Sequence, residues 1–187
     1  KIKRTKTVNF YGNVSSGAPI ENIDYIINKF KKPDLIIGIG GGSVMDIAKA
    51  CSCLFDKNRK KKFTNIKIEK KIKTILIPTI LGSGAENSRG AILKNKNNNK
   101  IAIRHDLIKA DFIYVDLNLV KSAKRKIKCE ALYDCFSHAI ETYISKYSNK
   151  TVRKRSLEAI NFLLTIKSKT FFDSIINLKR LALFSIL

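Results

Sequence analysis

The sequence predicts an α/β fold in its first part, followed by a segment that is helical throughout. Short apolar runs typical of buried strands alternate with helical patterns up to about residue 116. Two of these runs lead into loops rich in glycine and serine. From about Lys126 onward the apolar residues recur only at helical spacing. We therefore expect an α/β domain over residues 1–124 and a helical domain over residues 125–187.

The predicted elements of the α/β part follow in order along the chain. Residues 20–30 carry apolar side chains on one helical face, and Pro19 stands near the first turn of that helix. Residues 34–40 read as a buried strand and residues 44–54 as the helix that follows it. Residues 56–71 read as a basic surface connection. The remaining predicted elements are a strand over 73–79, a glycine and serine loop over 80–90, a hairpin of strands at 90–94 and 100–104, and a strand over 111–116.

The helical part is expected to break near residues 146–150 and 167–169. Its last helix carries Leu181, Leu183 and Phe184 without a later segment to cover them, and the chain begins without Met. An uncovered apolar helix face would be adhesive. We therefore expect the chain to be truncated at both ends.

The composition excludes several classes of protein. A hydrophobic content of 44% is typical of a globular protein. No apolar run approaches a membrane span, and the first residues lack the apolar core of a secretory signal, so we expect a cytoplasmic protein with no membrane partner. The cysteines lie in predicted helices without paired C-x-x-C spacing, which favours reduced, packed thiols over a metal or disulfide framework. They are Cys51, Cys53, Cys129 and Cys135.

The chain is strongly basic, with 37 Lys and Arg against 15 Asp and Glu and a formal net charge of +22. Such an excess is typical of nucleic-acid-binding proteins. Here it is dispersed over separate segments at 60–73, 94–100 and 121–128 and comes with much Asn and Ile, a bias that A- and T-rich codons produce on solvated faces. We expect no specific nucleic-acid partner, although any such surface adheres to polyanions at low salt.

The stretch at residues 34–50 is an apolar run that breaks into three glycines and resumes as a helix. It is not a G-x-G-x-x-G fingerprint, because Ser43 stands where the third glycine belongs, and it lacks the lysine of a P-loop. Glycine N–H groups and the positive end of a helix dipole suit a nucleotide pyrophosphate. The alternative is a tight turn in which Ser43 caps the helix, with Asp46 as its capping-box partner. Spacing alone leaves both interpretations open.

A second pair of residues could bind a metal ion. Asp134 and His138 lie four residues apart in a predicted helix, so that a carboxylate and an imidazole share one face. Such a pair can chelate Fe(II) or Zn(II). The alternative is an Asp–His hydrogen bond or a solvated face. The apolar neighbours Leu132, Phe136 and Ala139 lead us to expect burial, which would be costly for both groups without a partner.

Taken together, four segments resemble the iron-containing, metal-dependent alcohol dehydrogenase family. They are "GGGSVMDIAKA" (40–50), "IPTILGSGAE" (77–86), "KIAIRHDLIKADFIYVD" (100–116) and "DCFSHAIETYIS" (134–145). Their order and intervals fit across most of the chain. The resemblance implies a partial Rossmann-like dinucleotide-binding domain, without its first strand–turn–helix unit, followed by the start of a helical metal-binding domain.

The resemblance also implies roles for individual residues. The glycine turn and Ser43 would grip the pyrophosphate of NAD or NADP, and Asp46 would close the motif beside the cofactor. Hydroxyl contacts would come from the second loop, and a lysine would reach the nicotinamide ribose. The cofactor-binding residues so implied are Gly40, Gly41, Gly42, Ser43, Asp46, Thr79, Ser83 and Lys100. Asp134 and His138 would be the first two ligands of Fe(II) or Zn(II), with no further catalytic residue assigned.

The implied activity is NAD(P)-dependent, metal-assisted interconversion of an alcohol and an aldehyde or ketone by hydride transfer. The family needs two more histidines from later helices, whereas this chain holds only His105 and His138, and His105 reads as a loop histidine. A site with two protein ligands binds metal weakly. The chain is therefore expected to be either a fragment of an enzyme or a decayed, inactive relative.

Two rival interpretations remain. Dehydroquinate synthase and glycerol-phosphate dehydrogenases share the glycine turn, but their metal helix starts from a different ligand pattern. A basic nucleic-acid-binding module would account for the charge alone. The expected partner is a small alcohol or aldehyde, and a homo-oligomer is compatible with the sequence. Residues 82–93 faintly resemble members acting on acidic sugars or phosphonate aldehydes, for which Arg89 could pair with the substrate.

Overall fold

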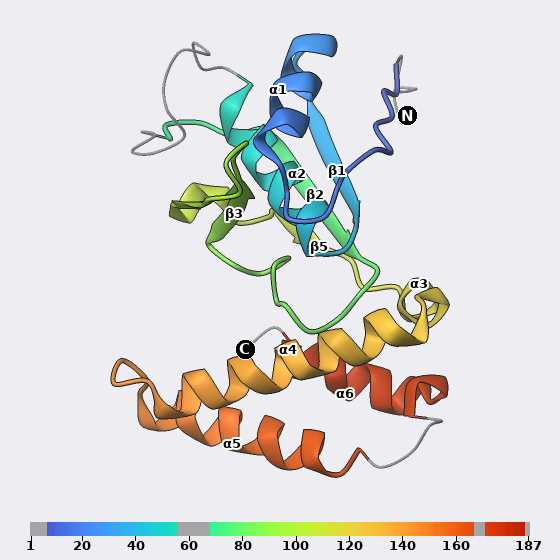
Figure 1. The fold of residues 1–187 in the computed structure, drawn as a ribbon, viewed down its shortest axis with the longest axis vertical. Coiled ribbons are helices and arrows are strands. Elements are labelled where there is room, and N and C mark those ends of the chain that lie inside the picture. Colours follow the sequence, from blue (N-terminus) through green and yellow to red (C-terminus); the bar gives the residue numbers. More distant parts are fainter. Residues whose placement is uncertain (1–6, 56–67, 167–170, 186–187) are drawn as a thin grey trace, which may run out of the picture.

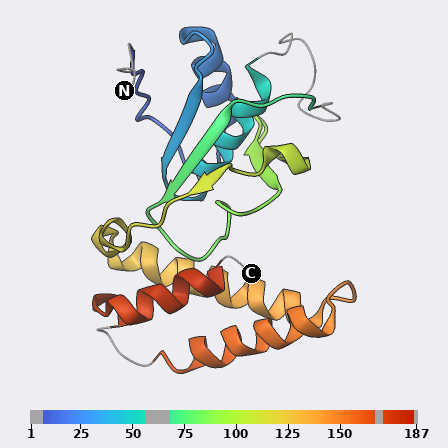
Figure 2. The same ribbon diagram turned by 180° about the vertical axis from the view of Figure 1, so that it is seen from behind.

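A computed structural model describes residues 7–55, 68–166 and 171–185. In these ranges an α/β part stands on a layer of long helices, and the carboxyl ends of the strands point toward that layer (Figures 1 and 2). The predicted fold class, an α/β part followed by a helical part, is confirmed. The boundary at residues 124 and 125 stays a prediction.

The central sheet holds three parallel strands in the order β1-β2-β5. These strands are β1 (Leu35–Gly40), β2 (Lys73–Pro78) and β5 (Phe112–Ile113). β1 and β2 pair along their whole length, from Leu35 opposite Lys73 to Gly40 opposite Pro78. The strand predicted at 111–116 is shorter than expected, because Asp116 already caps the next helix by accepting a hydrogen bond from the Asn118 N–H. The parallel register places the loops after β1 and β2 side by side.

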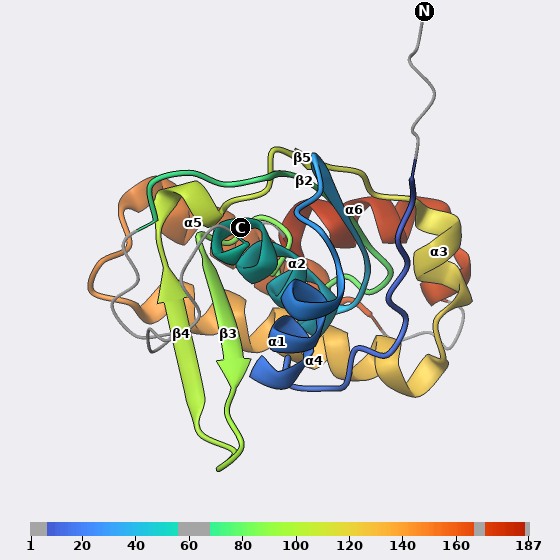
Figure 3. The same cartoon turned by 90° about the horizontal axis from the view of Figure 1, so that it is seen from above.

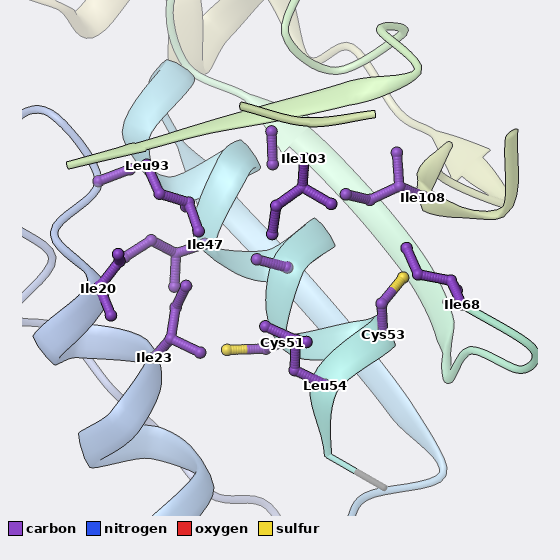
Figure 4. Packing of buried hydrophobic residues seen from close by; sticks show 13 residues of the cluster. Ile20, Ile23, Ile47, Cys51, Cys53, Leu54, Ile68, Leu93, Ile103 and Ile108 are labelled. Atoms are coloured by element: carbon purple, nitrogen blue, oxygen red, sulfur yellow. The ribbon is translucent and has the colours of Figure 1, made fainter. Parts of the chain in front are cut away.

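One face of the sheet is covered by two helices and a hairpin. The helices are α1 (Ile20–Lys29) and α2 (Gly42–Leu54), and the hairpin pairs β3 (Gly90–Lys94) with β4 (Lys100–Arg104). α2 lies in the middle, and all its side chains from Ile47 to Leu54 are buried. Ile23, Ile47, Leu93 and their neighbours form the core between these elements (Figure 4). Each such side chain contributes about 1.5–3 kcal/mol when fully buried.

The hairpin extends away from the sheet (Figure 3). Its turn is held by the Asn95 side chain, which accepts hydrogen bonds from the N–H groups of Asn97 and Asn99. Asn98 adopts φ 62°, a left-handed conformation that asparagine tolerates. The asparagine-rich stretch therefore forms the turn of the predicted hairpin.

The helical part contains the two longest helices in the described ranges, α4 (Arg125–Ile144) and α5 (Lys150–Leu164). The short helix α3 (Leu117–Ser122) precedes them, and a 3-10 turn, η2 (Phe171–Asp173), and α6 (Ile175–Ser185) follow. A further 3-10 turn, η1 (Asp106–Ile108), lies between β4 and β5 in the α/β part. The predicted break at 146–150 is confirmed, since Asn149 caps α5 by accepting a hydrogen bond from the Val152 N–H. The break predicted at 167–169 lies outside the described residues. α4 and α5 pack along each other beneath the α/β part (Figure 1).

Two expectations need correction. Residues 56–67 of the predicted surface connection lie outside the described ranges, but Ile68 near its end, and Ile72 just after it, are buried in the core. The last helix is not left uncovered as a whole, because Leu181 is buried in a cluster with Phe162 and Phe171. Leu183 on the opposite face is 71% exposed.

The cysteines are all free thiols, as predicted, and Cys51, Cys53 and Cys135 are buried. None of the helices in the described ranges is both long enough and apolar enough to cross a membrane.

Candidate functional site

The glycine turn (Gly40, Gly41 and Gly42) connects β1 directly to α2. Gly41 is the N-cap of α2, and the Gly40 carbonyl accepts a hydrogen bond of 2.8 Å from the Thr79 N–H after β2. A side chain at Gly40 would be strained, because its φ is +158° and an added Cβ would lie 2.6 Å from Val44 Cγ2. The N–H groups of the first turn of α2 lie at the positive end of a helix of 13 residues. This is the geometry expected of an anion-binding turn.

Ser43 does not cap the helix, so the capping interpretation is wrong. α2 begins at Gly42, its N-cap makes no side-chain hydrogen bond, and the Ser43 hydroxyl instead accepts a hydrogen bond of 3.0 Å from the Gly17 N–H. Asp46 is engaged as well. One of its carboxylate oxygens lies 3.1 Å from Lys49 Nζ, and the other accepts a hydrogen bond of 3.2 Å from the Ile92 N–H of β3. The carboxylate therefore bridges α2 and the hairpin.

The second glycine loop (residues 80–90) lies between the glycine turn and the helical layer (Figure 2). A Cβ on Gly42 would lie 3.4 Å from the Ser83 hydroxyl, so the two loops are in direct contact. At Gly82 a Cβ would lie 2.1 Å from the carbonyl oxygen of Ala131 in α4. At Gly84 it would lie 2.5 Å from the carbonyl of Ser185 in α6. The loop thus packs by its backbone against two helices, which only glycine permits at these points.

Asp134 and His138 lie on α4, one turn apart. Asp134 Oδ1 is 3.7 Å from His138 Nε2, and the side chains are 48% and 50% exposed. The expectation of burial is wrong, because α4 packs through another face, on which Cys135 is 3% exposed. The carboxylate and the imidazole remain open to a ligand from solvent. Across the described ranges, no three His, Cys, Asp or Glu side chains gather closely enough to hold a metal ion.

A pocket of about 370 Å³ lies between the second glycine loop and the helices α4, α5 and α6. His138 lines it from α4, together with Cys135 and Thr142. The loop contributes Gly82, Ser83, Gly84, Asn87, Ser88 and Arg89, and α5 and α6 contribute Ser156, Ala159, Phe184 and Ser185. Residues with hydroxyl, amide and cationic side chains therefore line one cavity. Arg89 is largely exposed and lies 3.0 Å from Asp106.

The remaining predicted residues lie at the edges of this region. Thr79 follows β2 and donates its N–H to the glycine turn. Lys100 is exposed at the start of β4 and pairs with Lys94 of β3. The Lys94 N–H donates a hydrogen bond to the Ala18 carbonyl, next to Gly17, which contacts Ser43. His105 is the N-cap of η1, and its Nδ1 accepts a hydrogen bond from the Leu107 N–H. This is the loop role expected for His105.

Sequence reasoning missed two buried charged residues beside the loops. Lys49 is fully buried in α2, and Glu86 in the second glycine loop is 1% exposed. Burial raises the pKa of the Glu86 carboxyl, and the hydrogen bond from its own backbone N–H and the nearby Lys49 ammonium offset this rise only in part. Glu86 Oε1 is buried without a hydrogen-bond partner in the described structure. The available signal was a lysine three residues after Asp46, inside an otherwise apolar helix.

Comparison with known proteins agrees with the resemblance in the sequence. Long-chain-alcohol dehydrogenase 1 of Geobacillus thermodenitrificans is 30% identical over 165 residues, which cover 84% of this chain and 42% of that protein. Aldehyde-alcohol dehydrogenase of Streptococcus pneumoniae is 31% identical over 147 residues, which cover 71% of this chain and 17% of that protein. The chain thus spans less than half the length of these curated relatives.

Solved structures share the fold. An iron-containing alcohol dehydrogenase from Thermotoga maritima superposes with a TM-score of 0.83 at 23% identity, covering 94% of this chain and 50% of that one. Sulfoacetaldehyde reductase from Bifidobacterium kashiwanohense, in complex with NAD+, gives a TM-score of 0.84 at 22% identity, covering 93% of this chain and 49% of that one. A sequence model described as iron-containing alcohol dehydrogenase matches residues 2–117. Since that match extends over more than half of the 187 residues, the chain belongs to the iron-containing alcohol dehydrogenase family.

Proposed function

We propose that this chain carries the dinucleotide-binding region and two metal ligands of an NAD(P)-dependent oxidoreductase, which interconverts an alcohol and an aldehyde or ketone by hydride transfer. The observation that supports this most is the position of the second glycine loop. It contacts the glycine turn at Ser83 and the metal-ligand helix α4 at Gly82. A cofactor gripped by the two loops would therefore lie close to a cation held on α4.

The glycine turn is the proposed pyrophosphate site. Its supports are the helix N-terminus, the close approach of the glycine backbone and the hydroxyl of Ser83 beside Gly42. Thr79 and Lys100 are the further proposed contacts, and the Lys100 ammonium would add positive charge. Asp46 contributes by positioning, because both of its carboxylate oxygens already contact Lys49 and β3. The NAD+ in the Bifidobacterium reductase complex supports NAD for a relative of this fold.

Asp134 and His138 are the proposed metal ligands in this chain. One carboxylate and one imidazole, 3.7 Å apart and half exposed, fit a divalent cation such as Fe(II) or Zn(II). When bound, the metal supplies a Lewis acid for the substrate oxygen, and the nicotinamide carries the hydride. The polar pocket beside His138 would orient a small alcohol or aldehyde.

Binding measurements on the chain test the proposed metal site. We expect titration calorimetry with Zn(II), and with Fe(II) under anaerobic conditions, to detect binding that Asp134→Asn and His138→Ala each abolish. Glu130→Gln is the matched control, because Glu130 is an exposed carboxylate four residues earlier on the same helix. Equal metal affinity in the wild type and Asp134→Asn would reject the ligand assignment.

The cofactor and the reaction are tested separately. NADH and NADPH fluorescence should report binding that weakens on Ser83→Ala, and alcohol-dependent reduction of NAD(P) should require added metal. Failure to bind either dinucleotide would reject the proposed cofactor site, even if the metal site is correct.

A further inference from the structure

Lys49 is a buried lysine that holds several elements together. Its side chain has no solvent exposure, although α2 is otherwise apolar along this stretch. The ammonium donates hydrogen bonds to the Ala85 carbonyl at 2.6 Å and the Ser88 hydroxyl at 2.8 Å, and a further short one to the Gly90 carbonyl. It also lies 3.1 Å from Asp46. A lysine ammonium has three N–H donors, and three of its partners lie in the second glycine loop.

The cluster around Lys49 joins three elements far apart in the sequence. Lys49 and Asp46 belong to α2, which starts at the glycine turn. The acceptors at Ala85, Ser88 and Gly90 belong to the second loop. Asp46 extends the connection to β3 by accepting from the Ile92 N–H. A single buried ion pair therefore fixes how the loop lies relative to both the turn and the hairpin.

The electrostatics make this connection sensitive to geometry. Burial lowers the pKa of the Lys49 ammonium, and the carboxylates of Asp46 and Glu86 oppose this lowering only in part. Burial likewise raises the pKa of Asp46, against the lowering effect of Lys49. A buried charge is stable only while its hydrogen-bond partners stay in place. The buried ammonium therefore stabilises the position of the loop carbonyls, and the carbonyls in turn stabilise the charged ammonium.

We propose that Lys49 is the positioning residue of the second glycine loop, and that it aligns this loop with the glycine turn for dinucleotide binding. The part that concerns the dinucleotide rests on the function proposed above. The part that concerns the loop stands on the contacts alone. Lys49 does not touch the cofactor in this scheme and acts through Ala85, Ser88 and Gly90.

The test compares Lys49→Met with Lys71→Met by amide hydrogen exchange. Lys71 is the matched control, because it also combines an aspartate, Asp111 at 2.8 Å, with a backbone carbonyl, that of Lys109. In Lys49→Met the amides of residues 82–92 should exchange at least about tenfold faster, since the loop opens locally. Lys71→Met should lose thermal stability without this effect. Unchanged exchange in the loop of a folded Lys49→Met would overturn the proposal.

Dinucleotide affinity supplies the second measurement. If the loop is correctly placed only one tenth of the time in Lys49→Met, the Kd for NADH rises about tenfold. The Zn(II) affinity of α4 should stay within about twofold, since the loop is not a ligand. A tenfold loss of NADH affinity in Lys71→Met as well would assign the effect to general stability and overturn the proposal. If the wild-type chain itself binds no NADH, but the loop of Lys49→Met still exchanges faster than that of the wild type, the proposed function is rejected and the role of Lys49 in the loop stands.

Ser88→Ala guards against a Lys49→Met variant that fails to fold. It removes one acceptor of the ammonium at an exposed residue and leaves the ion pair with Asp46. Its loop amides should exchange faster than those of the wild type and slower than those of Lys49→Met. Wild-type exchange in Ser88→Ala would count against the proposed network.

Discussion

Gly82→Ala should separate the second glycine loop from α4. The added methyl group would lie 2.1 Å from the Ala131 carbonyl oxygen, whereas real Cβ atoms essentially never come within 3.0 Å of such an atom. The loop must therefore move by about 1 Å, and such overpacking costs about 1–3 kcal/mol. The backbone φ of +153° adds strain of about 1–3 kcal/mol for a residue with a side chain. Together these two costs amount to about 2–6 kcal/mol, a large fraction of the about 5–15 kcal/mol that is typical of a folded domain.

Urea unfolding followed by far-ultraviolet circular dichroism measures this loss. With a slope of about 1–3 kcal/mol per molar urea, the midpoint should fall by about 1 M or more. Gly42→Ala is the control, since its methyl group would meet the Ser83 hydroxyl at an ordinary 3.4 Å and alanine favours a helix. Its midpoint should stay or rise, while its dinucleotide affinity falls. A Gly82→Ala midpoint equal to that of the wild type would refute the described packing of the loop on α4.

The remaining predictions concern thiols and pH. A thiol reagent at neutral pH should label Cys129 first, because Cys51, Cys53 and Cys135 are buried. Burial, aided by Asp24 and Cys53, raises the pKa of the Cys51 thiol to about 12 from 9.0, so the unfolded chain ionises first and stability falls as pH rises from about 9 toward 12; Cys51→Ala should show a shallower alkaline loss. Partial burial raises the pKa of Asp111, but its contacts with Lys71 and the Thr74 N–H lower the pKa by a larger amount. The ionised Asp111 therefore stabilises the fold above its unfolded pKa, and this stabilisation is lost as the pH falls. Acid titration of stability should be flatter in Lys71→Met than in the wild type.

Much of the fold was predictable from periodicity. The strand, turn and helix at residues 35–54 and the hairpin at 90–104 follow from local patterns, and the structure has them within a few residues of the predicted bounds. The start of α2 was misplaced because capping depends on backbone geometry. Ser43 had a local role available to it and took a distant partner, Gly17, instead.

The candidate site was less predictable, because its features depend on contacts between distant segments. Apolar neighbours suggested that Asp134 and His138 would be buried, but which face of α4 is covered is decided by α5 and the second glycine loop. The position of Lys49 among apolar residues of α2 hints at burial, but its acceptors lie about forty residues later in the chain and could not be identified from the sequence. The resemblance supplied the proposed ligands and cofactor contacts, and their roles stay predictions.

The outer face of β1 has a practical consequence for handling the protein. Leu35, Ile37 and Ile39 are alternate residues of β1, so that their side chains lie on the same face of the sheet, and they are 42%, 54% and 56% exposed. At low ionic strength, molecules with a net charge of +22 repel one another, and this repulsion keeps the exposed apolar side chains of different molecules apart. Added salt shortens the range of that repulsion to about 8 Å at 0.15 M. Concentrated stocks should consequently turn turbid as sodium chloride is raised, and dilute, low-salt buffers are the conditions in which the chain stays dispersed.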